Sequence, residues 1–208
     1  MSHLKKTICF TSCKNCDIMF ELRRKVFHIL FGSFFIFLSV FLPSYILMVL
    51  SLILLIIGFY LSEKGLEKYP FLQLILGKMD RPNEKQTKGR AMLLFVLSIF
   101  LLFLIDSFIG QKRMLVASLC LLTYADGFAT IIGSKLGRYK ITKTKTYEGT
   151  MFFFLIAFIF LATIYPQNIA RAFAVTLLCT IVELLPLEDN LSVPLSCYLF
   201  LYFFKFLF

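Results

Sequence analysis

SYILMVLSLILLIIGFYL, residues 44–61, decides the class of this protein, because it runs without a single charged side chain. A helix needs about 20 mostly apolar residues to cross the roughly 30 Å of hydrocarbon in a bilayer. Comparable apolar stretches recur along the chain, at residues 26–42, 90–109, 114–132, 150–165, 169–185 and 191–208. These runs are too long and unbroken to alternate as the strands of a membrane barrel do. The sequence therefore predicts an all-α, polytopic membrane protein of about seven transmembrane helices.

The composition and the N-terminal segment agree with this class. Hydrophobic residues make up 59% of the chain, against about 45–50% in water-soluble domains. Residues 1–25 are polar and basic, and they lack the apolar stretch and the small-residue cleavage site of a signal peptide. We expect a basic cytoplasmic tail over 1–25 and a single transmembrane catalytic domain over 26–208.

Three cysteines in this tail, Cys9, Cys13 and Cys16, have the spacing C-x3-C-x2-C. The spacing also occurs in iron–sulfur enzymes of the radical SAM type, but those enzymes need a barrel around the cluster. Membrane helices follow here, so an incidental or loosely metal-binding tail is the favoured interpretation and its purpose is left open.

The basic residues predict the orientation in the membrane. If the seven helices alternate, 18 of the 22 Lys and Arg side chains fall on one side, in the tail and in the loops 62–90 and 133–149. The positive-inside rule places that side in the cytoplasm. The net charge of +10 is thus mainly a topology signal, and because its charges sit in short loops between spans, no nucleic-acid partner is expected.

Ionisable residues in or against the apolar spans are functional candidates, since each costs several kcal/mol in hydrocarbon. The stretch ELRRKVFH puts Glu21, Arg24, Lys25 and His28 on one face of a helix that enters the bilayer. Snorkelling explains the basic members alone. It does not explain Glu21 and His28 on the same stripe, so functional and structural interpretations are equally supported.

Asp126 lies roughly 10 Å inside an apolar segment, measured at helical rise from Gly133. The adjacent Gly127 permits close backbone approach or a break in the helix. A buried carboxylate must face a partner, a cation or water, and Lys135 and His28 are candidate structural partners. We favour a metal or substrate role.

The segment 133–150 carries five basic residues among glycines and threonines. Backbone amides at glycine turns, with lysines as point charges, form an anion site suited to phosphates. The residues concerned are Gly133, Lys135, Gly137, Lys145 and Gly149. The Walker A pattern does not occur, which disfavours a P-loop ATPase. The alternative is a solvated loop that only enforces topology.

An acidic turn between the last two spans contains Glu183, Glu188, Asp189 and Asn190, with no basic residue nearby in the sequence. Its repulsion must be relieved by a cation or by the lysine-bearing loop. Oxygen ligands of this kind suit Mg²⁺, which typically takes one or two carboxylates together with substrate phosphates. Carboxylates and lysines on one side of the membrane describe phosphoryl or nucleotidyl transfer.

At these residues the chain resembles the CTP-dependent lipid kinases, a family that includes dolichol kinase, phytol kinase and yeast-type diacylglycerol kinase. The resemblance spans residues 21–194 and rests on five motifs in order. They are E-x-x-R-K-x-x-H from Glu21 to His28, KGR ending at Arg90, A-D-G-x-A-x-I-I-G-x-K-x-G from Ala125 to Gly137, K-T-x-E-G-T from Lys145 to Thr150, and E-x-x-x-x-x-D-N-L-x-x-P from Glu183 to Pro194.

The resemblance implies transfer of the γ-phosphate of CTP, or of a related nucleotide, to a lipid alcohol with Mg²⁺ as cofactor. The alcohol would be a polyprenol or dolichol, phytol or diacylglycerol. It implies catalytic roles for Asp126, Glu183 and Asp189, with Asp126 and Asp189 as metal ligands. Nucleotide or phosphate contacts would come from Arg90, Gly133, Lys135, Gly137, Lys145, Glu148, Gly149 and Asn190, and substrate or structural contacts from Glu21, Arg24, Lys25 and His28.

Two other classes are weighed against this one. Phosphatidate cytidylyltransferases, which make CDP-lipids, share the D-x-x-A-x-x-x-G-x-x-x-G and K-T-x-E-G elements, but their terminal H-G-G…D-R-x-D segment is absent here. A small cation-coupled transporter would place Asp126 and Glu183 near the midplane and show internal repeats, which the sequence lacks. The lipid alcohol, the nucleotide, the role of each carboxylate and the oligomeric state stay open at this level.

Overall fold

A computed structural model describes residues 2–63, 90–142 and 145–205. The predicted loop 62–90 falls almost wholly outside this described part. Within it the regular elements are helices joined by short turns and loops, apart from one isolated bridge between Lys140 and Thr146. The elements are α1 (Ser2–Phe41), α2 (Ser44–Glu63), α4 (Arg90–Ile109), α5 (Lys112–Cys120), the π-helical turn η2 (Leu121–Ala125), α6 (Asp126–Leu136), α7 (Tyr147–Ile164), α8 (Ile169–Leu184) and α9 (Asp189–Phe204).

The helical membrane class is confirmed. Among the described residues, five helical segments are long and apolar enough to cross a bilayer, and α5, η2 and α6 together form one of them. They are Leu22–Phe41, Ser44–Leu61, Ala91–Ile109, Lys112–Leu136 and Tyr147–Ile164. The helices α8 and α9, 16 residues each, occupy the positions of the last two predicted spans. The count of seven spans stays a prediction.

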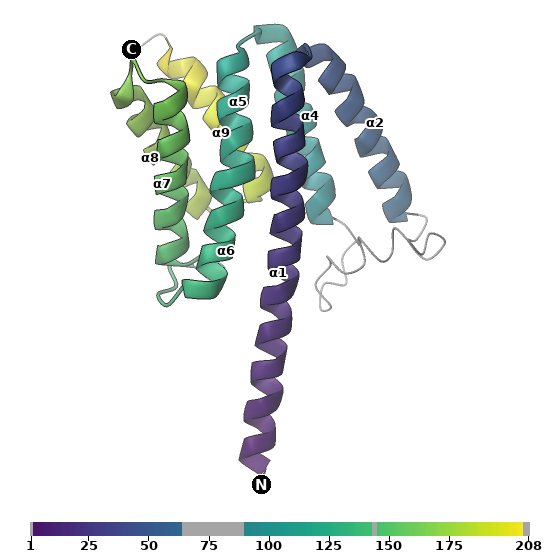
Figure 1. Ribbon diagram of the computed structural model, residues 1–208, viewed down its shortest axis with the longest axis vertical. Coiled ribbons are helices and arrows are strands. Elements are labelled where there is room, and N and C mark those ends of the chain that lie inside the picture. The colour runs from purple at the N-terminus through teal and green to yellow at the C-terminus, as the bar shows by residue number, and fades with distance from the viewer. Residues whose placement is uncertain (1, 64–89, 143–144, 206–208) are drawn as a thin grey trace.

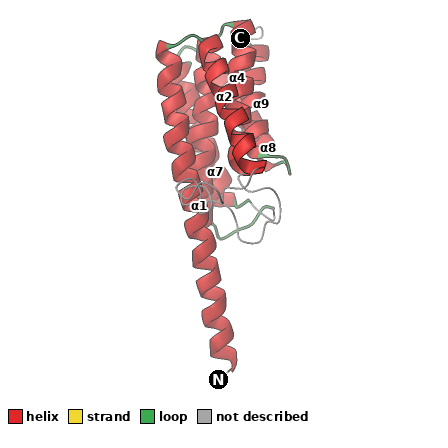
Figure 2. Cartoon of the chain, turned by 90° about the vertical axis from the view of Figure 1, so that its right-hand side faces the viewer, coloured by secondary structure: helices red, strands yellow, loops and turns green. Residues whose placement is uncertain are grey.

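The helices form an up-and-down bundle whose connections gather at its two ends (Figures 1 and 2). The basic end, as we call it, carries the loop between α6 and α7 and the turn between α8 and α9. The opposite end carries the connections from α1 to α2, from α4 to α5 and from α7 to α8. Helix α1 runs without a break through residue 25, and its N-terminal half projects beyond the basic end of the bundle. The bundle thus brings the predicted polar motifs to one end, although its side of the membrane stays a prediction.

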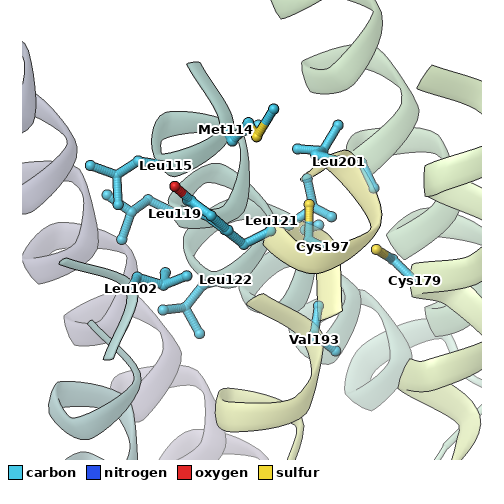
Figure 3. Close-up of a cluster of buried hydrophobic side chains, with 14 of the residues drawn as sticks. Leu102, Met114, Leu115, Leu119, Leu121, Leu122, Cys179, Val193, Cys197 and Leu201 are labelled. Atoms are coloured by element: carbon cyan, nitrogen blue, oxygen red, sulfur yellow. The ribbon is translucent and has the colours of Figure 1, made fainter. Parts of the chain in front are cut away.

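The central helix of the bundle is the continuous α5–η2–α6 segment. It is 67% buried inside the molecule, whereas the other four spans are 17–39% buried. Leucines of this helix pack against α9, which in turn packs against α8, in the apolar cluster of Figure 3, which includes Leu121, Cys179 and Cys197. Cys120, Cys179 and Cys197 are free and buried, in keeping with their expected role as packing residues.

Two glycines let α1 lie directly against this central helix. A Cβ atom added at Gly32 would lie 2.2 Å from Thr123 Oγ1, and one at Gly127 would lie 2.8 Å from Ile29 Cγ1. Neither position has room for a Cβ atom, so both depend on glycine. Small residues of this kind are the usual means of close helix packing in membranes. The close backbone approach predicted at Gly127 is therefore present, and it places the polar face of α1 beside Asp126.

Candidate functional site

Asp126 begins α6 immediately after the π-helical turn η2. Its backbone N–H donates to the carbonyl of Leu121, five residues back, instead of the fourth residue back as in an α-helix. Single π-turns within α-helices occur frequently at functional sites. The Asp126 side chain is only 4% exposed, so its charge is held inside the bundle near the basic end.

Lys25 of α1 is the direct partner of Asp126. The Lys25 Nζ atom lies 2.5 Å from Asp126 Oδ2, and both side chains are buried. A buried carboxylate needs such compensation, because an unpaired charge in a low-dielectric interior is strongly destabilising. The second carboxylate oxygen, Oδ1, has a long contact of 3.5 Å from Thr130 Oγ1. Asp126 is thus paired through one oxygen and weakly engaged through the other.

The sequence suggested His28 and Lys135 as partners of Asp126, but neither is its main partner in the structure. His28 Nε2 lies 3.9 Å from Asp126 Oδ2 and makes its hydrogen bond, of 2.9 Å, to the Leu122 carbonyl. Lys135 is exposed at the far end of α6. Lys25 takes this place because the α1 face that carries His28 also carries Lys25 one turn earlier.

Lys145 joins the loop before α7 to the acidic turn. Its Nζ atom donates to Glu183 Oε1 at 2.6 Å and also contacts Asp189 Oδ2. Thr150 Oγ1 donates to the other Glu183 oxygen at 3.2 Å. Burial would lower the pKa of Lys145, but the Asp189 and Glu183 carboxylates outweigh it and raise that pKa above its usual value. The repulsion within the acidic turn is therefore relieved by the lysine-bearing loop, one of the two expected solutions.

These three ion pairs belong to one cluster. The charge of Asp126 repels that of Asp189, and the charge of Lys145 attracts Asp126. Helix α6 packs against both α1 and α7, and α8 packs against α9. The group formed by Lys25, Asp126, Lys145, Glu183 and Asp189 is called the carboxylate–lysine cluster below.

The glycines of the predicted phosphate loop contribute to packing. A Cβ atom at Gly133 would lie 2.9 Å from Thr146 Oγ1 and 3.4 Å from Gly149 Cα. One at Gly137 would lie 2.2 Å from the Gly133 carbonyl oxygen. The glycines therefore allow the end of α6 to lie against the start of α7, where Thr146 caps the helix by accepting from the Gly149 N–H.

Glu148 holds the same loop in shape. Its Oε1 atom accepts from the backbone N–H groups of Arg138, at 3.0 Å, and Tyr139, at 3.4 Å. These contacts give Glu148 a supporting role in the loop conformation. Similarly, Asn190 Nδ2 donates to the Ala91 carbonyl at 3.3 Å and ties the start of α9 to the start of α4.

Three exposed basic side chains lie at the same end of the bundle as the cluster, and we call them the rim. Lys135, Arg138 and Lys140 are exposed on and after the end of α6. Within the described part of the chain, none of the three forms an ion pair with a carboxylate. They are therefore more accessible to an incoming anion than Lys145, which is engaged with two carboxylates. Arg24 is half-buried on α1, and the side chains of Glu21 and Arg90 lie outside the described part.

The donor set fits a magnesium ion shared with a substrate better than a metal enclosed by protein. Among the described residues, no three His, Cys, Asp or Glu side chains gather as a metal site. Asp189 Oδ1 is buried without a hydrogen-bond partner, and Asp126 Oδ1 has only its long contact. One or two carboxylate oxygens, completed by water and phosphate oxygens, are what Mg²⁺ ordinarily takes.

Fold and site together define a helical membrane protein with carboxylates and lysines paired at one end of its bundle. The chain is 28% identical over 211 residues to a protein named probable phytol kinase, chloroplastic, of Triticum aestivum, a match that covers 85% of the chain and 65% of that relative. It is 27% identical over 210 residues to phytol kinase 1, chloroplastic, of Arabidopsis thaliana, covering 88% of the chain and 66% of the relative.

A bacterial relative has a more similar length. An uncharacterized protein of Rickettsia prowazekii (strain Madrid E) is 27% identical over 198 residues, covering 88% of the chain and 94% of that protein. No protein-family model and no solved structure matches the chain. The chain thus spans about two thirds of the length of these two plant phytol kinases. The resemblance to the lipid kinase family that the motifs indicate is confirmed, as a distant relationship.

Proposed function

We propose that this protein is a lipid kinase that transfers a phosphate from CTP, or a related nucleoside triphosphate, to the hydroxyl of a membrane lipid alcohol. The observation that carries the proposal is the carboxylate–lysine cluster, buried or half-buried at the same end of a membrane bundle as three exposed cations. The phytol kinases among the relatives favour phytol or a similar isoprenoid alcohol over diacylglycerol.

Each part of the cluster has a role in this reaction. Lys135, Arg138 and Lys140 would receive the phosphate chain of the nucleotide at the rim. Asp126 and Asp189 would hold Mg²⁺, whose chemistry is to neutralise phosphate charge. Phosphoryl transfer depends mainly on positioning and charge stabilisation, so a site built from fixed charges suits it.

The lipid hydroxyl would meet the nucleotide at Asp126. This carboxylate is the member of the cluster that lies deepest in a spanning helix, so it is the one that a lipid head presented from the bilayer would meet once the Lys25 pair opens. In the transfer, the bond between the γ-phosphorus and its bridging oxygen breaks and a bond from the lipid oxygen to phosphorus forms. The hydroxyl proton passes to Asp126, and the nucleoside diphosphate leaves with the displaced oxygen.

The test is label transfer by the purified full chain in lipid nanodiscs. CTP labelled at the γ-phosphate or at the α-phosphate would be offered with phytol, a polyprenol, diacylglycerol or phosphatidate, with Mg²⁺ or with a chelator. A lipid monophosphate labelled only from the γ position supports the kinase. A lipid labelled from the α position supports the cytidylyltransferase alternative and overturns the kinase.

The matched control is a second buried aspartate at the opposite end of the bundle. Asp126→Asn should abolish the labelled product, whereas Asp106→Asn should retain it. Absence of label with every acceptor would overturn both enzymatic interpretations and favour transport.

A further inference from the structure

We propose that His28 is a positioning residue that holds the π-turn η2 open and thereby aims the Asp126 carboxylate at α1. The proposal rests on the proposed function for its kinetic readout, but the contact itself can be tested without any activity. It follows from three observations: the register of the π-turn, the partner of the His28 ring and the position of Lys25.

The π-turn changes the pairing of one carbonyl. In an α-helix the Asp126 N–H would donate to the Leu122 carbonyl, four residues back. Here that N–H donates to the Leu121 carbonyl. The wider turn therefore releases the Leu122 carbonyl from its usual partner, in a part of the bundle where Leu122 is fully buried. A buried carbonyl needs a donor, because loss of hydration without a hydrogen bond is unfavourable.

His28 supplies that donor from another helix. Its Nε2 atom lies 2.9 Å from the Leu122 carbonyl oxygen, which can only accept, so Nε2 carries the hydrogen. The ring is buried and lies 3.8 Å, centroid to centroid, from the ring of Phe95 on α4. The imidazole is thus fixed between α4 and the π-turn, with its N–H directed at the released carbonyl.

The same face of α1 also holds the carboxylate that follows the turn. Lys25, one turn before His28, pairs with Asp126. An extra residue in a turn rotates everything after it by about 100° relative to a continuous α-helix. Without the π-turn, Asp126 would therefore face a different direction from the Lys25 ammonium. His28 stabilises the turn, and the turn directs the carboxylate.

The first test uses the unaltered chain, so that no variant has to fold. The protein has two histidines, and Leu122–Thr123 is its one Leu–Thr dipeptide. Solid-state NMR in bilayers, with ring-¹⁵N histidine, ¹³C-carbonyl leucine and ¹⁵N threonine, would select this carbonyl. We expect a protonated Nε2 on His28 and a dipolar coupling between it and the Leu122 carbonyl. An unprotonated Nε2, or no coupling, would overturn the proposal.

The second test compares two variants of equal side-chain length. His28→Gln keeps an N–H donor at nearly the reach of Nε2, and His28→Met removes it. We expect kcat for lipid phosphorylation to fall roughly tenfold in His28→Met, as for loss of one positioning hydrogen bond, with KM for the nucleotide unchanged. His28→Gln should recover most of that loss.

Equal rates in the two variants, or a change in KM alone, would contradict a positioning role. If His28→Met does not fold, His28→Gln against the unaltered chain, together with the NMR coupling, still decides the question. If the unaltered chain makes no labelled lipid, the proposed function has failed. The NMR coupling then reports on the His28 contact by itself.

Discussion

Two buried aspartates, one at each end of the bundle, are accommodated in different ways. Asp106, at the end of α4, accepts hydrogen bonds from Ser44 Oγ at 2.5 Å, from the Gln111 N–H at 2.9 Å and from the Tyr198 hydroxyl at 2.9 Å. Asp126 has a lysine on one oxygen and a long hydroxyl contact on the other. Both residues are at most 3% exposed.

The difference separates a structural carboxylate from a candidate functional one. Neutral donors from α2, α9 and the connection before α5 surround Asp106 and fasten these elements together at the opposite end. Asp126 depends on a long, flexible lysine that can exchange one oxygen partner for another. Exposed cations lie at both ends of the bundle, Lys112 and Arg113 near Asp106 among them, so the direct partners distinguish the two carboxylates. Burial alone therefore does not mark a reactive group; under the proposed function, the incompletely engaged carboxylate is the reactive one.

The largest expected effect is a difference in phosphorylation rate between variants of the two aspartates. Asp126→Asn removes the charge that would accept a proton and bind metal, so phosphorylation should fall by about 10³-fold. Asp106→Asn keeps a carbonyl oxygen for Gln111 and Tyr198, and its activity should stay within about threefold of the unaltered protein. Initial rates of γ-label transfer measure both. Similar losses of activity in the two variants would contradict the different roles given to Asp126 and Asp106.

Removal of the Lys145 charge should affect activity and stability together. Lys145→Met leaves Glu183 and Asp189 facing each other without their cation, and we expect roughly 100-fold slower transfer. The free energy of unfolding should fall by roughly 2 kcal/mol, below the range for fully buried pairs because Asp189 is partly exposed.

A double variant separates the effect of the Lys145 charge on stability from its effect on activity. Lys145→Met combined with Asp189→Asn should recover most of the stability, because one of the two repelling charges is gone, but none of the activity. Thermal unfolding in the same detergent measures the first quantity, and label transfer the second. Recovery of activity in the double variant would contradict the role given to Asp189.

At the opposite end the expected effect is on stability alone. Tyr198→Phe removes one donor from the buried Asp106 and should lower the free energy of unfolding by about 1–3 kcal/mol. Transfer rates measured well below the unfolding temperature should match those of the unaltered protein. A loss of activity larger than the loss of folded protein would show that the two ends are not independent.

The smallest effect is expected at the rim. Lys135→Ala and Lys140→Ala each remove one exposed charge and should raise KM for the nucleotide by roughly three- to tenfold, with kcat unchanged. The effect should shrink as salt increases, because exposed charges are screened. Lys112→Ala, an exposed lysine at the opposite end, is the matched control and should leave KM unaltered.

Much of the fold could be predicted from the sequence. The apolar runs predicted each helix of the bundle, because runs of this length admit few other structures in a bilayer. The spacing of Lys25 and His28 predicted a shared face on α1, and the isolated acidic turn predicted relief either by a cation or by the lysine-bearing loop. These features depend on local periodicity or on charge balance, which a sequence displays directly.

Other features of the site depend on how the helices meet. Lys25 is indistinguishable in sequence from a basic residue flanking a span, and it pairs with Asp126 only because Gly32 and Gly127 let α1 approach. The π-turn before Asp126 adds a residue without a recognisable pattern. Glu148 braces the loop through backbone N–H groups, and such contacts leave no mark on residue spacing.

The pairing within the carboxylate–lysine cluster has a consequence for electroneutrality. Three carboxylates, Asp126, Glu183 and Asp189, and two ammonium groups, Lys25 and Lys145, leave one formal negative charge uncompensated. A single dication would change the balance to one positive charge, which attracts a triphosphate and opposes a second dication. Under the proposed function, metal and nucleotide would therefore enter most favourably as one complex, and excess free metal would gain little.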